Sequence, residues 1–231
     1  PDTEPIQHTA AAGATRWLGL YPAVVTDVRD PDGQGRVYVR VPWAPDGTQG
    51  YGAWARVATL MAGPQRGVWC LPDVDTEVLV AFEGGDPGRP CVIGTLWSAQ
   101  APPPAAMDAG GGNHRKLLRS RSGLTVTLDD QPGAARLSVD TPGGQRLVLA
   151  DGGGRVEISD ASGNIVVLEA GGVTLRSAST LTLQAGMVTV SASSLTVDAG
   201  VAKFSGVVQV DTLIANGVIS ASYTPGAGNI L

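Results

Sequence analysis

The sequence has 231 residues and a formal net charge of −5, which argues against a nucleic-acid-binding surface, because phosphate binding is dominated by clustered Lys and Arg. Its 32 glycines and 16 prolines make up about a fifth of the chain, so long helices are not expected. Neither an apolar run of about 18 residues nor a basic segment followed by an apolar core is present, so we expect no spanning helix, no secretory signal and synthesis in the cytoplasm.

Residues 1–18 are small and polar and show no periodicity. We interpret them as an N-terminal arm that is ordered only against a partner.

Residues 19–97 contain short β-type runs that are rich in valine and aromatic residues. Turn sequences separate them, including Asp-Pro-Asp-Gly at 30–33 and the pair Gly84-Gly85, where positive φ is expected. The runs are 24–28, 36–41, 53–60, 67–71, 77–82 and 91–96. They predict a small antiparallel barrel, whose core is expected to include Trp69, Trp97, Val78 and Val80.

Cys70 and Cys91 each lie in an apolar run and are too few for a disulfide scaffold. We expect two buried free thiols, with one bridge between neighbouring strands as the alternative.

Residues 98–113 contain three prolines followed by three glycines, which is typical of a linker. From residue 114 onward, runs of about five residues end at Gly, Asp or Asn. Their spacing tightens to seven residues in 177–200, where Leu181-Thr182-Leu183 is followed by Val188-Thr189-Val190 and Leu195-Thr196-Val197.

Strands this short bury too little apolar surface to stand alone, since each fixed residue costs roughly 1–2 kcal/mol of backbone entropy. From residue 170 on, the charged side chains that usually block edge pairing are scarce. A single-chain β-solenoid needs roughly 18 or more residues per turn, so an intertwined multimer is favoured, in which strands pair between chains. The residues then expected to face the axis are Leu181, Leu183, Val188, Val190, Leu195 and Val197, with Thr182, Thr189 and Thr196 facing solvent.

Three segments closely resemble the spike proteins of contractile tails, namely the phage baseplate assembly protein V family and the matching part of the VgrG proteins. They are LGLYPAVVTDVRDPDGQGRVYVRVPW (18–43), GAWARVATLMAGPQRGVWCLPDVDTEVLVAFEGGDPGRPCVIGTLW (52–97) and HRKLLRSRSGLTVTLDD (114–130). The resemblance implies an all-β chain with an N-terminal OB-fold barrel at 19–97 and a triple-stranded β-helix spike at 114–231.

By that resemblance the chain is a homotrimeric central spike that links a hub to a tip and pierces the target cell envelope. Its expected partners are two further copies, a hub or tube-initiator protein at the barrel and a tip protein of the Pro-Ala-Ala-Arg (PAAR) repeat type. The residues expected to dock the tip are Tyr223, Thr224, Pro225, Asn229, Ile230 and Leu231. The spike would be assembled into a virion tail baseplate or a contractile injection particle, and the hub would be a separate protein, unless the sequence is a fragment.

No catalytic, cofactor or metal site is expected. Asp129-Asp130 precedes Gln131-Pro132-Gly133 and is interpreted as an ordinary turn rather than a glycosidase pair. His8 and His114 both lie far from the end of the sequence, so a metal-bound tip is not expected. The alternatives are a trimeric β-helical receptor-binding fibre or adhesin and, third, a wall hydrolase.

Overall fold

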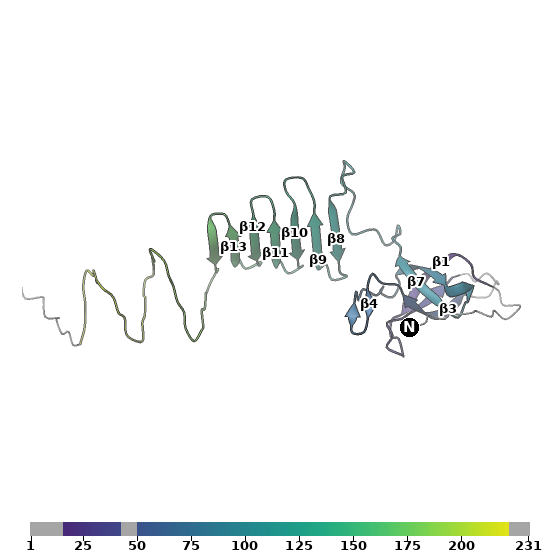
Figure 1. Ribbon diagram of the computed structural model, residues 1–231, viewed down its shortest axis with the longest axis horizontal. Coiled ribbons are helices and arrows are strands. Elements are labelled where there is room, and N and C mark those ends of the chain that lie inside the picture. The colour runs from purple at the N-terminus through teal and green to yellow at the C-terminus, as the bar shows by residue number, and fades with distance from the viewer. Residues whose placement is uncertain (1–15, 43–49, 222–231) are drawn as a thin grey trace, which may run out of the picture. The chain divides into compact units, whose positions relative to one another are not determined.

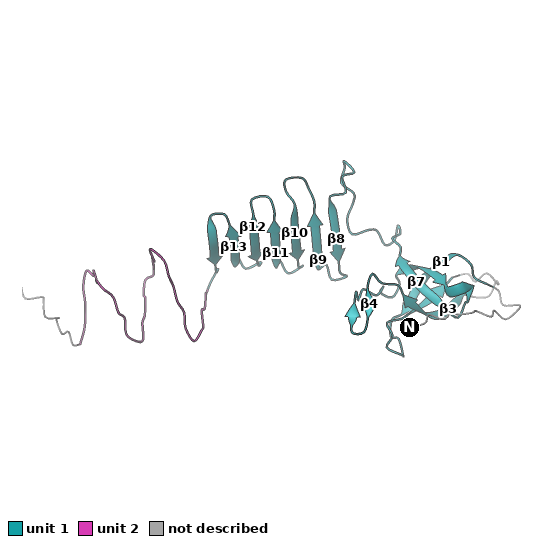
Figure 2. Cartoon of the chain, viewed as in Figure 1, with its two compact units in different colours: residues 1–179 teal, residues 180–231 magenta. Residues whose placement is uncertain are grey.

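A computed structural model describes residues 16–42 and 50–221 (Figure 1). Two units are distinguished along the chain, residues 1–179 and residues 180–231 (Figure 2). Strands make up nearly all the regular structure. Within the described ranges, no helix is long and apolar enough to cross a membrane.

The first domain is a closed five-stranded barrel in the order β1-β2-β3-β7-β6. Its strands are β1 (Leu20–Asp27), β2 (Val37–Val41), β3 (Tyr51–Val57), β6 (Glu77–Phe82) and β7 (Pro90–Thr95). The antiparallel prediction is wrong for one pair, because β3 and β7 run parallel. A closed ring of five strands cannot alternate direction throughout, so one parallel pair is unavoidable.

The barrel core is built from alternate residues of each strand, as the pleat requires. In β6 the burial pattern alternates strictly, and Val78 and Val80 are fully buried. The other core residues are Ala23, Val25, Val37, Val39, Val41, Ala55, Phe82 and Val92. Valine fills most of these positions because the interior of a small barrel accommodates short branched side chains.

Trp69 and Trp97 were expected in this core, and that expectation is wrong. Their side chains are 75% and 71% exposed. The buried tryptophan is Trp17, at 4% exposure, whose backbone N–H donates to the Gly85 carbonyl at 2.9 Å. Trp17, which was placed in the predicted arm at 1–18, therefore packs in the barrel.

Trp17 packs in a cluster of aromatic rings with Tyr21, Tyr51 and Phe82, with ring centroids 4.9 to 5.7 Å apart. The Tyr51 hydroxyl donates to the Pro87 carbonyl. This cluster supplies the bulky apolar volume that the sequence assigned to Trp69 and Trp97.

The turns of the barrel behave as their sequences predict. Gly84 and Gly85 have φ of +63° and +76° in the short 3-10 turn η1 (Glu83–Gly85). In the β1–β2 turn the Asp30 carboxylate accepts hydrogen bonds from the backbone N–H of Gln34 at 2.7 Å and of Arg36 at 3.1 Å, and pairs with the Arg36 guanidinium at 2.6 Å. One buried carboxylate thus organises the whole turn.

Residues 67–71 do not form a barrel strand, contrary to expectation. The chain instead makes a small hairpin from β4 (Ala62–Gly63) and β5 (Arg66–Gly67), and residues 68–71 follow it without strand pairing. Cys70 in this segment is exposed and Cys91 is half-buried, both as free thiols. The expectation of free thiols is confirmed, whereas the expected burial is wrong for Cys70.

Beyond residue 114 the chain forms a seven-stranded antiparallel sheet, here called the ladder, in which each strand pairs with its neighbours in sequence (Figure 1). Its strands are β8 (Arg115–Arg119), β9 (Thr125–Asp129), β10 (Arg136–Asp140), β11 (Arg146–Ala150), β12 (Arg155–Ser159), β13 (Ile165–Glu169) and β14 (Gly172–Arg176). Pairing between chains was expected here, and for these strands that is wrong. Turns of two to six residues join them, short enough for antiparallel neighbours of one chain to pair.

The turn between β12 and β13 shows how these reversals are fixed. The Asp160 carboxylate accepts from the backbone N–H groups of Ser162 and Asn164 at 2.9 and 3.0 Å, and Gly163 adopts φ +88°. Asp in such turns bonds to its own backbone, and only glycine takes this φ without strain.

Candidate functional site: the apolar face of the ladder

The register of the ladder places two rows of apolar side chains on one face. Residues directly opposite each other in an antiparallel pair share a face, so each row can be followed from strand to strand. The first row is Leu118, Val126, Val139, Leu147, Ile158, Val166 and Leu175. The second is Lys116, Leu128, Leu137, Leu149, Val156, Leu168 and Val173. Lys116 is the one charged side chain in either row.

The opposite face of the ladder carries the charges. Arg155 on β12 pairs with Glu157 and with Glu169, both at 2.8 Å, and Arg136 pairs with Asp129 at 3.3 Å. The Arg155 guanidinium holds the pKa of the Glu157 carboxyl below its ordinary value. Matched charges suit a face that stays in water, whereas the two apolar rows do not.

The apolar face is uncovered within one chain. Ile158 is 52% exposed, and Leu118, Leu128, Leu149, Leu168 and Leu175 are exposed as well. A contiguous apolar surface that spans seven strands is larger than a monomeric domain normally leaves in water. Within residues 16–42 and 50–221, nothing covers this face.

The apolar pairs continue in sequence beyond the ladder. Among the described residues after 176, no strand is assigned, and the second unit runs as an extended trace (Figure 2). The six residues expected to face an axis, Leu181, Leu183, Val188, Val190, Leu195 and Val197, are between 55% and 72% exposed. Thr182, Thr189 and Thr196 are exposed too, so in one chain both sides of the repeat lack a cover.

The residues expected to dock a tip protein, Tyr223, Thr224, Pro225, Asn229, Ile230 and Leu231, lie outside the described residues. Asp129 and Asp130 lie at the end of β9 and in the turn after it. The Asp129 carboxylate accepts from the Gln131 backbone N–H at 3.3 Å and from Arg136, as an ordinary turn would have it. Within residues 16–42 and 50–221, His, Cys, Asp and Glu form no group that could hold a metal ion.

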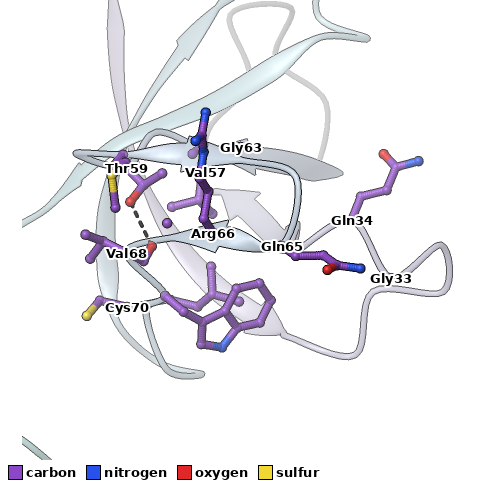
Figure 3. Close-up of a pocket in the computed structure, with 15 residues that line it drawn as sticks. Gly33, Gln34, Val57, Thr59, Gly63, Gln65, Arg66, Val68 and Cys70 are labelled. Atoms are coloured by element: carbon purple, nitrogen blue, oxygen red, sulfur yellow. Dashed lines mark hydrogen bonds between the residues drawn. The ribbon is translucent and has the colours of Figure 1, made fainter.

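The barrel carries a groove of about 700 Å³ between the β1–β2 turn and the β4–β5 hairpin (Figure 3). Val57, Met61, Val68 and Trp69 supply apolar surface to it, and Arg66 is its only charged lining residue. No Asp, Glu or His is among its lining residues.

Two family models match the chain. Residues 21–97 match the type VI secretion system/phage-baseplate injector OB domain, and residues 136–196 match the phage baseplate V C-terminal trimerisation domain. The first range covers the barrel, and the second covers strands β10 to β14 of the ladder and nearly all of the repeat at 177–200. The two matches therefore place an injector-type OB domain before a baseplate-type trimerisation domain in this chain.

Curated relatives agree with these matches. The chain is 29% identical over 122 residues to the type VI secretion system spike protein VgrG1a of Pseudomonas aeruginosa, which covers 49% of this chain and 19% of that protein. It is 37% identical over 78 residues to the spike protein VgrG3 of Vibrio cholerae (33% and 8%) and 36% identical over 75 residues to the actin cross-linking toxin VgrG1 of the same species (32% and 7%). These alignments span less than a fifth of each relative. More particularly, the chain combines a match to the injector OB domain with a match to the baseplate V trimerisation domain, and it is distantly similar to VgrG spike proteins.

Proposed function

We propose that the chain forms the homotrimeric central spike of a contractile tail, with the apolar faces of three ladders turned inward around a common axis. The observation that carries this proposal is the pair of apolar rows that runs through all seven strands of the ladder. Three such faces cover one another, while the ion-paired faces remain in water. The match to a trimerisation domain over residues 136–196 supports three copies.

The repeat after the ladder extends the same axis. Its apolar pairs are spaced as the ladder's are, two residues apart, and they recur every seven residues. In the trimer each short strand pairs with strands of the other two copies. Leu181, Leu183, Val188, Val190, Leu195 and Val197 then face the axis, and Thr182, Thr189 and Thr196 face solvent.

This arrangement suits a structure that must withstand mechanical force. A lateral force on one strand is resisted by the hydrogen bonds on both of its sides and by apolar contacts to two other copies. The spike thus links a hub or tube-initiator protein at the barrel to its tip and passes the force of contraction to the target cell envelope. A PAAR-type protein docks at Tyr223–Leu231, and the assembled machine is a virion baseplate or a contractile injection particle.

Size-exclusion chromatography with light scattering tests the trimer, and electron microscopy of negatively stained particles tests the needle. At micromolar concentration and neutral pH the expected mass is three times 23.5 kDa, and the expected image is an elongated particle. A mass of 23.5 kDa would refute the proposal.

A receptor-binding fibre would need exposed aromatic side chains along the needle to hold a carbohydrate. After residue 100 the only aromatic residue in the described ranges is Phe204. Glycan-array binding at micromolar strength would nevertheless replace the spike with that fibre.

A further inference from the structure

A second exposed apolar surface lies on the barrel. It consists of Leu60, Met61, Val68 and Trp69 around the β4–β5 hairpin, and we call it the hairpin patch. Leu60 is 96% exposed, and the indole of Trp69 is three-quarters exposed. Together with the adjoining groove in Figure 3, this patch is apolar surface that the folded barrel does not use.

The hairpin patch is held in place rather than loose. The Thr59 hydroxyl donates to the Val68 carbonyl at 2.8 Å, and the Val68 N–H donates to the Met61 carbonyl at 3.0 Å. The Trp69 ring lies so close to Gly35 that a Cβ at that glycine would be 3.0 Å from a ring carbon. A rigid, exposed tryptophan beside a groove is the kind of anchor on which protein interfaces depend.

The chemistry of the patch points to an apolar protein surface as its partner. From Val57 to Leu71 the only charged side chain is Arg66. An acidic or basic partner would find almost no opposite charge here, and interface cores are depleted in charge in the same way.

A second copy of the chain is the apolar partner that the proposed trimer brings closest to the patch. In the proposed trimer, residues 98–113 connect each barrel to its ladder. A flexible coil of this length has an end-to-end distance of only ~20–25 Å. Neighbouring barrels then meet at an effective concentration in the millimolar range. A contact from one barrel to the next closes into a ring under three-fold symmetry, so no patch remains uncovered.

We propose that the hairpin patch of each barrel packs against the barrel of the neighbouring copy, with Trp69 as its anchor. This inference rests on the proposed trimer. It adds a second interface, distinct from the ladder, that would hold the three barrels in fixed positions at the head of the spike.

The exposed thiol of Cys70, next to Trp69, reports on the patch. In a Cys91→Ser background, the rate at which Ellman's reagent modifies Cys70 is measured in the trimer and in the Ile158→Asp chain, in which the ladder's inward face is disrupted. Ser159→Asp, which alters the opposite face, is the matched control. We expect Cys70 to react at least ~10-fold more slowly in the trimer and in Ser159→Asp than in Ile158→Asp.

Adding Trp69→Ser to the trimer should restore fast modification of Cys70 while light scattering still reports three copies. A trimer whose Cys70 reacts as fast as that of the Ile158→Asp chain would overturn the second interface and leave the ladder interface intact. A chain that is monomeric by light scattering would refute the trimer itself, so the two failures are distinguishable.

Discussion

Ile158→Asp tests most directly which face of the ladder is turned inward. Ile158 lies within the first apolar row, with neighbours on both sides, and is 52% exposed in the single chain. Full burial of such a side chain contributes about 1.5–3 kcal/mol, so covering the exposed half contributes about 1 kcal/mol per chain and about 3 kcal/mol per trimer. Aspartate loses this contribution and also buries a carboxylate without a partner, at several kcal/mol per chain.

The combined cost is on the order of 10 kcal/mol per trimer, and each 1.4 kcal/mol is a factor of about ten in the equilibrium constant. We therefore expect Ile158→Asp to abolish the trimer at micromolar concentration, as measured by light scattering. Ile158→Val, which removes one methylene, should retain the trimer with a lower melting temperature.

Ser159→Asp changes the neighbouring residue, whose side chain lies on the ion-paired face, and should leave the trimer intact. If Ile158→Asp remains a trimer with an unchanged melting temperature, or if Ser159→Asp disrupts the trimer equally, the assignment of the inward face is wrong.

Three further changes test other parts of the molecule. The pKa of Asp30 is lowered chiefly by its hydrogen bond to Arg36, so the stability it contributes is present above the ordinary pKa of 3.8 and is lost as the pH falls below it. Asp30→Asn should therefore destabilise the barrel in urea most at pH 7, and progressively less as the pH is lowered from 3.8 to 2. An equal loss at pH 7 and pH 2 would exclude this linkage. Gly85→Ala should cost more stability than Gly84→Ala. Both substitutions put alanine at a positive φ, which costs about 1–2 kcal/mol, but only at Gly85 would the new Cβ also contact a leucine methyl, at 3.1 Å. Equal denaturation midpoints for the two variants would contradict this. Lys116→Leu completes the second apolar row and should raise the melting temperature of the trimer, whereas a lower one would indicate that this end of the row remains in water.

The barrel strands were predictable because their alternation of valine with polar residues is a local signal. The strand β2 shows it clearly, because the buried Val37, Val39 and Val41 alternate with Tyr38 and Arg40. The parallel β3–β7 pair was not predictable from alternation, because it depends on how many strands close the ring.

The placement of the tryptophans was not predictable for a different reason. Trp69 and Trp97 lie in apolar runs that are indistinguishable by composition from core strands. Hydrophobicity indicates that a side chain will be buried, but not whether its own domain or another chain covers it. Trp17 stands among small residues without periodicity, and only the fold brings it to Phe82, at a ring-centroid distance of 4.9 Å.

The short strands after residue 114 were predictable from the Gly, Asp and Asn residues that end each run, but the strands with which they pair were not. The few charged residues and the small apolar area of each strand indicate that the apolar face is covered. They do not distinguish pairing of strands within one chain from pairing between chains. The strand register decides this for the ladder, where turns such as Asp160–Asn164 return each strand to its own chain, whereas residues 177–200 are assigned no strand.

The number of hairpins in the ladder also sets the length of this part of the molecule. Neighbouring strands lie about 4.8 Å apart, so each added hairpin lengthens the sheet by about 9.6 Å, whatever its detailed sequence. Because successive strands alternate in direction, strands must be gained or lost in pairs to keep each turn at its proper edge. The length of the sheet is thus proportional to its number of hairpins. Duplication or deletion of one hairpin changes that length by a fixed step and leaves the other strand pairs unchanged.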